Sequence, residues 1–201
     1  MPKTASDKVL ALARKSGVLR ARDLDAYHIP REYLARLVQR GLLEHQGRGL
    51  YTPASVSKSA HHTLVQVAVR VPDAVVCLLS ALAFHGITTQ QPPVVWLALP
   101  RSARRPKLDY PPLRICHYSE PAFSAGVETH RIEGRSVKIY SVAKTIADSF
   151  KYRNKIGLDV ALEALQTAWR NKKVSMHDIE QHAAICRVSR VMRPYLEALV
   201  A

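Results

Sequence analysis

The chain has 201 residues, of which 47% are hydrophobic, and its 30 Lys and Arg against 16 Asp and Glu give a formal net charge of +14. This length supports one large or two small hydrophobic cores, and the charge favours a polyanionic partner such as DNA, RNA or an acidic protein. Three scattered cysteines, the lack of a signal-peptide pattern and the lack of a long apolar run argue against a disulfide scaffold and a membrane partner, so we expect a cytoplasmic protein.

The segment from Gly17 to Pro53 predicts a winged helix-turn-helix, a fold that places its second motif helix in the DNA major groove. Pro30 suits the first turn of that helix, and Gly41 suits the left-handed residue that ends it. Gly47 and Gly49 allow a tight hairpin, the wing. We expect a supporting helix over residues 6–16, the two helices of the motif over 21–27 and 31–40, and the two wing strands over 42–46 and 50–52.

One face of the expected 31–40 helix suits DNA recognition. Leu34, Leu37 and Val38 recur at helical spacing, which predicts that they are buried. The opposite face and the wing tip carry side chains that reach phosphates or base edges. These candidate DNA-binding residues are Arg31, Tyr33, Arg36, Gln39, Arg40 and Arg48. Because winged-helix domains also bind proteins, and surface arginines are usually only solvated, a protein-interaction module is the alternative.

Residues 53–59, PASVSKS, form the expected linker. We therefore predict a winged-helix DNA-binding domain over residues 1–56 and a C-terminal domain over residues 57–201. In the second part the patterns predict a helix over 61–71 and a buried helix over 74–85. They also predict strands over 94–99, 113–118, 128–132 and 136–141, and helices from 142, 158, 175 and 189 onward. A small, largely antiparallel sheet surrounded by helices follows, so the fold class is α+β.

The patterns that could carry catalysis or bind a metal are incomplete. Asp23 and Asp25 have the spacing of a two-metal carboxylate pair, but nothing else completes such a site. The histidines and cysteines lack metal-ligand spacing, so we expect no metal, no cofactor and no enzyme. Lys144 and Asp148 lie four residues apart, for which a helix-surface ion pair is the simplest interpretation. A ligand or partner contact is the alternative.

Several motifs, in their order along the chain, carry a resemblance to a known family. They are GRGLY at 47–51, CLLSAL at 77–82, HGIT at 85–88, VWLALP at 95–100 and, strongest, IYSVAKTIADSFKYR at 139–153. With them the chain, from about residue 8 to about 170, resembles the AbiEi-type antitoxins of bacterial toxin–antitoxin and phage-defence operons.

The resemblance implies a protein with two functions. The winged helix would bind double-stranded DNA repeats in its own promoter and repress the operon, using the candidate residues named above. The C-terminal domain would counter a nucleotidyltransferase-like toxin, directly or indirectly. Lys144, Asp148 and Arg153 fall on the C-terminal motif, for which the resemblance implies no catalytic role. A ligand-sensing transcriptional regulator without an antitoxin role is the alternative.

Overall fold

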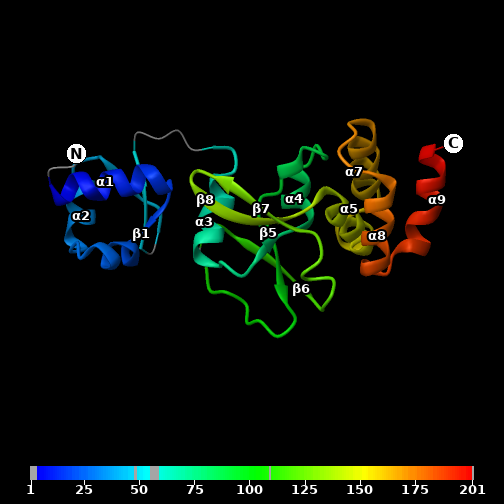
Figure 1. Ribbon diagram of the computed structural model, residues 1–201, viewed down its shortest axis with the longest axis horizontal. Helices are drawn as coiled ribbons and strands as arrows, with labels where there is room; N and C mark the ends of the chain where they lie inside the picture. Colours follow the sequence, from blue (N-terminus) through cyan, green and yellow to red (C-terminus); the bar gives the residue numbers. More distant parts are fainter. Residues whose placement is uncertain (1–3, 48, 55–58, 109, 201) are drawn as a thin grey trace. The chain divides into compact units, whose positions relative to one another are not determined.

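The computed structural model describes residues 4–47, 49–54, 59–108 and 110–200, and Figure 1 labels the helices and strands. Contacts between residues divide the chain into two compact units. The first unit comprises Met1–Pro72 and His130–Val137, and the second comprises Asp73–Thr129 and Lys138–Ala201. The domain boundary predicted between residues 56 and 57 lies outside the described residues, so it stays a prediction.

Within residues 4–47 and 49–54 the described elements form a winged helix-turn-helix, as predicted. In chain order the elements are α1 (Ala5–Ser16), β1 (Leu19–Arg20), the 3₁₀ helix η1 (Ala21–Tyr27), α2 (Glu32–Gln39), β2 (Leu43–His45) and β3 (Leu50–Pro53). The strands form an antiparallel sheet in the order β1-β3-β2. Pro30 does not stand in the first turn of α2, because the helix begins at Glu32 and Arg31 is its N-cap.

One hydrophobic core holds these three helices together. It contains Val9 and Ala13 from α1, Leu24 from η1, and Leu34 and Leu37 from α2. The two leucines of α2 are buried as predicted, and burial of each side chain contributes about 1.5–3 kcal/mol. This packing fixes the inner face of α2 and therefore leaves its opposite face toward solvent.

The first unit continues beyond the wing with α3 (His62–Arg70). The side chain of Arg20 donates a hydrogen bond to the Val69 carbonyl oxygen at 3.3 Å. The Gln66 amide donates to the side-chain oxygen of Gln46 at 3.3 Å, and Gln66 is buried. These bonds connect the helix with the winged-helix sheet.

The second sheet has the strand order β6-β5-β4-β8-β7 and is mixed rather than largely antiparallel. Its strands are β4 (Val75–Val76), β5 (Val95–Pro100), β6 (Leu113–Tyr118), β7 (Val127–Ile132) and β8 (Arg135–Tyr140). The β4–β5 pair is antiparallel, whereas β5–β6 and β4–β8 are parallel. The prediction was wrong because the segment between β5 and β6 is long enough for a parallel crossover.

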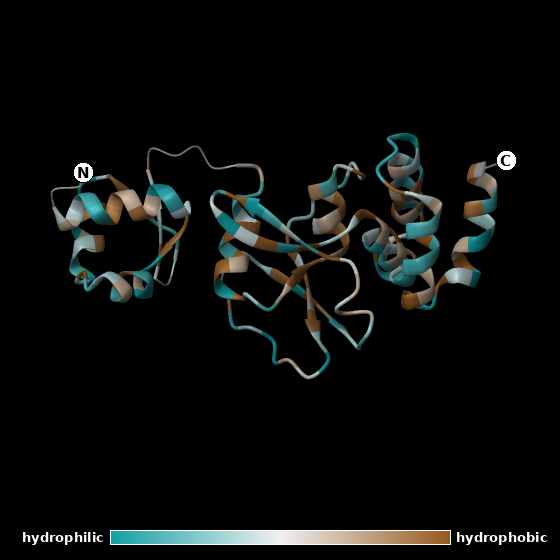
Figure 2. Cartoon of the chain, viewed as in Figure 1, coloured by the Kyte–Doolittle hydropathy of each residue, from teal (hydrophilic) through white to brown (hydrophobic). Residues whose placement is uncertain are grey.

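The segment predicted as one buried helix over 74–85 is a strand followed by a helix. Val75 and Val76 form β4, and α4 (Leu78–His85) begins after Cys77. A short apolar run is compatible with either a buried strand or a buried helix, so periodicity could not separate them. Hydrophobic residues recur along the strands of this sheet (Figure 2).

After β8 the described residues form the helices α5 (Val142–Lys151), α6 (Arg153–Ile156), α7 (Leu158–Arg170), α8 (Met176–Cys186) and α9 (Ser189–Val200). The helix α5 contacts α4, α7 and α8. Its Ile146 and Phe150 belong to the same buried core as Ala161 and Leu165 of α7. Because other helices cover α5 from several sides, polar residues of α5 are buried as well.

Candidate nucleic-acid interface

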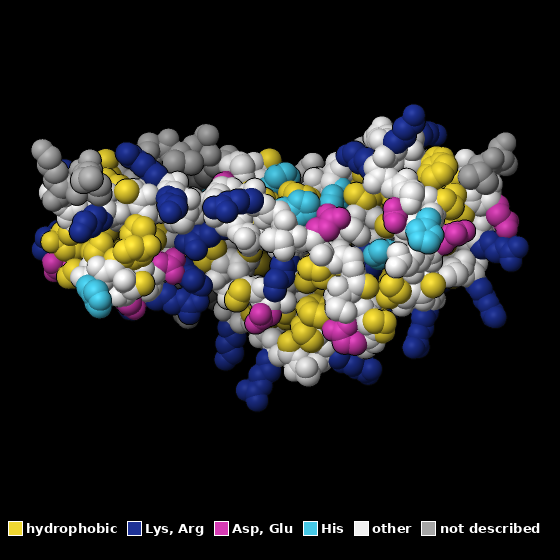
Figure 3. Space-filling model, viewed as in Figure 1, with side chains coloured by type: hydrophobic (Ala, Val, Ile, Leu, Met, Phe, Trp, Pro, Cys, Tyr) yellow, Lys and Arg dark blue, Asp and Glu magenta, His cyan; other side chains and the backbone are white. Residues whose placement is uncertain are grey.

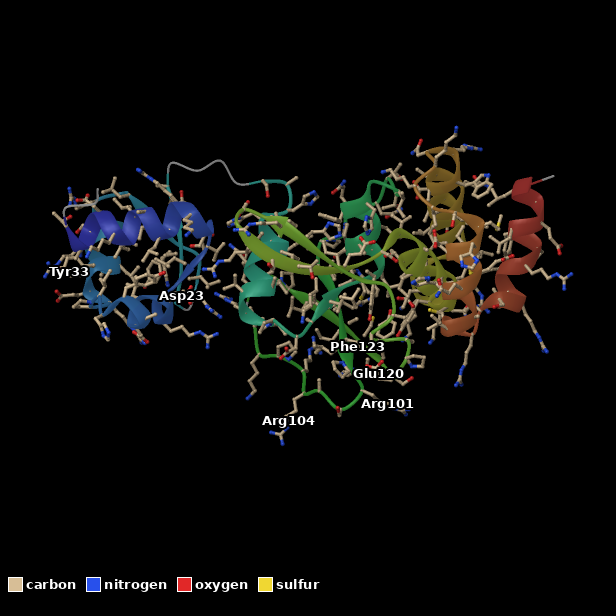
Figure 4. All side chains as sticks on the ribbon, in the orientation of Figure 1. Asp23, Tyr33, Arg101, Arg104, Glu120 and Phe123 are labelled. Carbon is tan, nitrogen blue, oxygen red and sulfur yellow. The ribbon has the colours of Figure 1, made fainter. Side chains whose placement is uncertain are left out.

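The outer face of α2 carries most of the predicted DNA-binding residues. Arg31, Arg36, Gln39 and Arg40 are exposed, and Tyr33 is half-buried. Figure 4 labels Tyr33 on this helix. The helix and its two capping residues, Arg31 and Arg40, therefore carry five of the six predicted residues, and Leu34 and Leu37 pack the other face of α2 into the core.

Two of these arginines are held by carboxylates. Arg31 makes two hydrogen bonds to Asp25, at 3.2 Å from Nε and 2.6 Å from Nη2. Arg36 Nη2 lies 3.2 Å from a Glu32 carboxylate oxygen, and its guanidinium carbon lies 5.3 Å from the Tyr33 ring centroid. Both ion pairs are exposed, so solvent screens them and a phosphate can replace the carboxylate at small cost.

Gln39 and Arg40 differ from these arginines. In the part of the chain that the structure describes, neither side chain has a hydrogen-bond or ion-pair partner. An amide and a guanidinium are the groups that read adenine and guanine edges in the major groove. These two residues at the end of α2 are therefore free to bind without breaking an internal contact.

The wing is a tight hairpin. The Gln46 backbone N–H donates to the Leu50 carbonyl oxygen at 2.9 Å, and the Gln46 side chain donates to Thr52 Oγ1 at 3.1 Å. Gly47 and Gly49 have φ values of 98° and 68°, which glycine adopts without strain. Arg48 lies outside the described residues, so its role at the wing tip stays a prediction.

Asp23 and Asp25 each bind arginine. Asp23 accepts from Arg20 Nε at 2.9 Å and from Arg135 Nη2 at 2.9 Å. Burial raises the pKa of Asp23, but the hydrogen bonds from Arg20 and Arg135 outweigh it and lower that pKa below its ordinary value. Asp25 is bound to Arg31. Among the described residues, no three His, Cys, Asp or Glu side chains are grouped as metal ligands would be.

The tip of the β7–β8 hairpin contacts the winged helix within the first unit, which the sequence did not reveal. Arg135 Nε donates to the carbonyl oxygens of Ser16 at 3.2 Å and Val18 at 3.0 Å, and Nη2 bonds Asp23. A Cβ atom on Gly17 would collide with the Glu133 backbone. The hairpin tip therefore packs against the end of α1 at backbone-to-backbone distance.

Lys144 and Asp148 are not on a helix surface. The two side chains are fully buried, and Lys144 Nζ lies 2.5 Å from an Asp148 carboxylate oxygen. The ammonium also lies 4.1 Å from the Tyr140 ring centroid and 4.8 Å from that of Tyr118. The spacing of four residues predicts that the side chains are neighbours, but it does not say which face of the helix carries them.

The other carboxylate oxygen of Asp148 accepts a hydrogen bond from Cys186 Sγ at 3.3 Å. Burial raises the pKa of Asp148 despite the opposing effect of Lys144. Burial and the Asp148 charge raise the pKa of the Cys186 thiol to about 12. Arg153 lies apart from this pair on α6 and donates to the Phe150 carbonyl oxygen at 2.9 Å.

Basic side chains are prominent over much of the visible surface (Figure 3). No helix in the described part of the chain combines the length and the apolar character that crossing a membrane requires. The basic side chains agree with a polyanionic partner, which the net charge of +14 already favours.

Comparison with known proteins finds similarity to a protein family and to solved structures. Residues 7–54 match the family model AbiEi_4, described as a transcriptional regulator and AbiEi antitoxin. The crystal structure of the RV2827C protein from Mycobacterium tuberculosis is similar in fold, with a TM-score of 0.61 and 14% identity over 92% of this chain and 72% of that chain. A comparison with curated protein sequences finds no match. Residues 7–54, which include the winged helix, are therefore similar to the AbiEi antitoxin family of transcriptional regulators.

Proposed function

We propose that this protein is the antitoxin of a bacterial toxin–antitoxin system and binds double-stranded operator repeats in its own promoter. The observation that carries the proposal is the exposed face of α2, on which Gln39 and Arg40 have no internal partner among the described residues. In this assignment α2 enters the major groove and the wing follows the phosphate backbone. Bound in this way, the protein represses its operon.

The residues of α2 divide into two roles in this proposal. Gln39 and Arg40 contact base edges, because they bind without breaking another bond. Arg31 and Arg36 contact phosphates, which replace the carboxylates of Asp25 and Glu32. Tyr33 supports Arg36 through their ring contact, and Arg48 contacts the backbone from the wing tip.

The C-terminal domain, in this proposal, neutralises a nucleotidyltransferase-like toxin in the cytoplasm, directly or indirectly, and is not itself an enzyme. The burial of Lys144 and Asp148 supports a structural role for this pair, because a substrate cannot reach either side chain without displacing the helices packed on α5. Phage defence is the setting in which such a toxin–antitoxin pair would act.

The test of DNA binding is a fluorescence-anisotropy titration of the full chain with the duplex upstream of its own gene and with a scrambled duplex. Titrations at several salt concentrations separate contacts with phosphates from contacts with base edges. We expect a preference of about a thousandfold or more for the upstream duplex. Equal binding to both duplexes, with the same steep salt dependence, would overturn operator recognition and indicate nonspecific binding to polyanions.

The test of antitoxin function is co-expression of the full chain with the cognate toxin and measurement of growth. Arg40→Ala is the variant that separates the two functions, because Arg40 is exposed on the DNA-reading helix. We expect this variant to lose repression but to rescue growth. Failure of both the wild type and the variant to rescue growth would overturn the antitoxin assignment without touching DNA binding.

A further inference from the structure

The first unit contains a pocket of about 260 Å³ between α1, η1 and the tip of the β7–β8 hairpin. Three of its lining residues, Lys15, Tyr27 and Arg131, are exposed and are called its rim, and the less exposed Asp23 and Arg135 are called its floor. We propose that this α1–hairpin pocket binds a nucleotide unit, with the phosphate held by Lys15 and Arg131 and the base stacked on Tyr27. The proposal does not depend on DNA recognition by α2.

The negatively charged and carbonyl groups on the floor of the pocket already have arginine partners. Arg135 binds the carbonyl oxygens of Ser16 and Val18 at the C-terminal end of α1, as well as the Asp23 carboxylate. Asp23 is bound a second time by Arg20. The carbonyls at a helix C-terminus and a carboxylate would repel a phosphate, but here each of them already faces a guanidinium. Repulsion from the pocket floor is therefore small.

The rim supplies the positive charge that remains. Lys15 and Arg131 are exposed, and neither forms an ion pair or hydrogen bond with another described side chain. Because Arg135 balances Asp23, these two cations are an excess at one concave place. Charge-assisted hydrogen bonds to phosphate are the strong class of such bonds, and arginine offers a fork that fits two phosphate oxygens.

Tyr27 gives the site its preference for a base. The side chain is a large aromatic with 57% of its surface exposed, at the end of η1 and at the rim of the same pocket. Aromatic rings bind nucleotide bases by stacking, with little dependence on which base is bound. The small volume suits one nucleotide unit whose base rests at the rim, and it does not suit a duplex.

The experiment is isothermal titration calorimetry of the full chain, without DNA, with adenosine 5′-monophosphate, adenosine and inorganic phosphate in turn. We expect the monophosphate to bind more tightly than either part alone. Lys15→Ala and Arg131→Ala should each weaken its binding by about tenfold or more. Tyr27→Ala should weaken it as well, whereas Tyr27→Phe should retain it.

The matched control is Lys8→Ala, which removes an exposed lysine from the same helix α1 but not from the pocket. All of these side chains are exposed, so the variants should unfold at the wild-type temperature, which a thermal scan checks. If Lys8→Ala weakens binding as much as Lys15→Ala, general charge attraction explains the result and the pocket assignment is overturned.

Two sources could supply the nucleotide unit: a free mononucleotide or one unit of a single-stranded nucleic acid. The same titration with a short single-stranded oligonucleotide distinguishes them. Binding of the oligonucleotide alone, lost in Arg131→Ala and kept in Lys8→Ala, would support the site and assign its source to a strand. If neither ligand binds in a way that depends on Lys15 and Arg131, the proposal is wrong, whatever the operator titration shows.

Discussion

Lys144 and Asp148 form an ion pair at 2.5 Å in which neither side chain reaches solvent. Removal of two charges from water costs several kcal/mol for each ion, and their attraction repays this only when the remaining hydrogen-bonding groups are satisfied. The second Asp148 oxygen accepts from Cys186, and the Lys144 ammonium faces the Tyr118 and Tyr140 rings. The pair therefore depends on both partners being present.

We predict that Asp148→Ala lowers the free energy of unfolding by about 3–5 kcal/mol, because it leaves the Lys144 ammonium buried without a counter-charge. Combining Lys144→Met with Asp148→Leu should recover most of this loss, since no charge is then buried. Urea unfolding at neutral pH measures both. Glu197→Ala, which breaks the exposed Arg193–Glu197 pair on α9, is the control and should change stability little. A double variant as unstable as the single one would contradict this account.

Gly17 and Gly41 can be compared by alanine substitution. Their φ values are 65° and 66°, so an alanine is strained at either site, and the ψ of −52° at Gly17 adds to the strain there. A Cβ on Gly41 meets nothing within 4 Å, whereas one on Gly17 meets the backbone of Glu133. We expect Gly17→Ala to lower the unfolding temperature clearly more than Gly41→Ala. Equal effects in thermal denaturation would mean that the hairpin tip does not press on the end of α1.

The contrast between these features shows what the sequence could and could not reveal. The winged helix follows from local signals, namely the spacing of Leu34 and Leu37 and the glycines at residues 41, 47 and 49, so its order of elements could be predicted. The bond between Asp23 and Arg135 joins residues 112 positions apart. No local pattern marks that partner, and only the three-dimensional packing brings it to the pocket.

The sheet of the second unit also has a feature that local sequence patterns could not predict. The hydrophobic patterns predicted the positions of β5 and β6 in the sequence. They did not predict that the two strands pair in parallel, because that depends on the path of the connecting segment, which periodicity does not encode. In the same way the spacing of Lys144 and Asp148 predicted that they are neighbours, whereas their burial depends on α4, α7 and α8 covering α5. Both the strand direction and the burial of the ion pair depend on contacts between segments that are distant in the sequence.

Glu133 should make stability depend on acid pH. Burial raises its pKa, but hydrogen bonds from His62 and Ser59 outweigh burial and lower the pKa below the ordinary 4.5. A carboxylate with a depressed pKa stabilises the fold above its unfolded-state pKa, and this stabilisation is lost as pH falls through the folded-state pKa. We expect Glu133→Gln to be less stable than the wild type at about pH 6 and the difference to shrink toward about pH 3. A difference that is constant with pH, in urea titrations, would exclude this role.

Arg40→Ala tests the assignment of base contacts on α2. If Arg40 meets a base edge, the substitution should weaken binding to the upstream duplex by about 1–3 kcal/mol and relax the preference for one base pair. Arg36→Ala, at a residue assigned to a phosphate, should instead weaken binding to upstream and scrambled duplexes alike and reduce the salt dependence. Anisotropy titrations with both duplexes at several salt concentrations separate these outcomes. Arg193→Ala on α9 removes an exposed arginine from the other unit and serves as the control. Unchanged affinity in both α2 variants would show that another element reads the DNA.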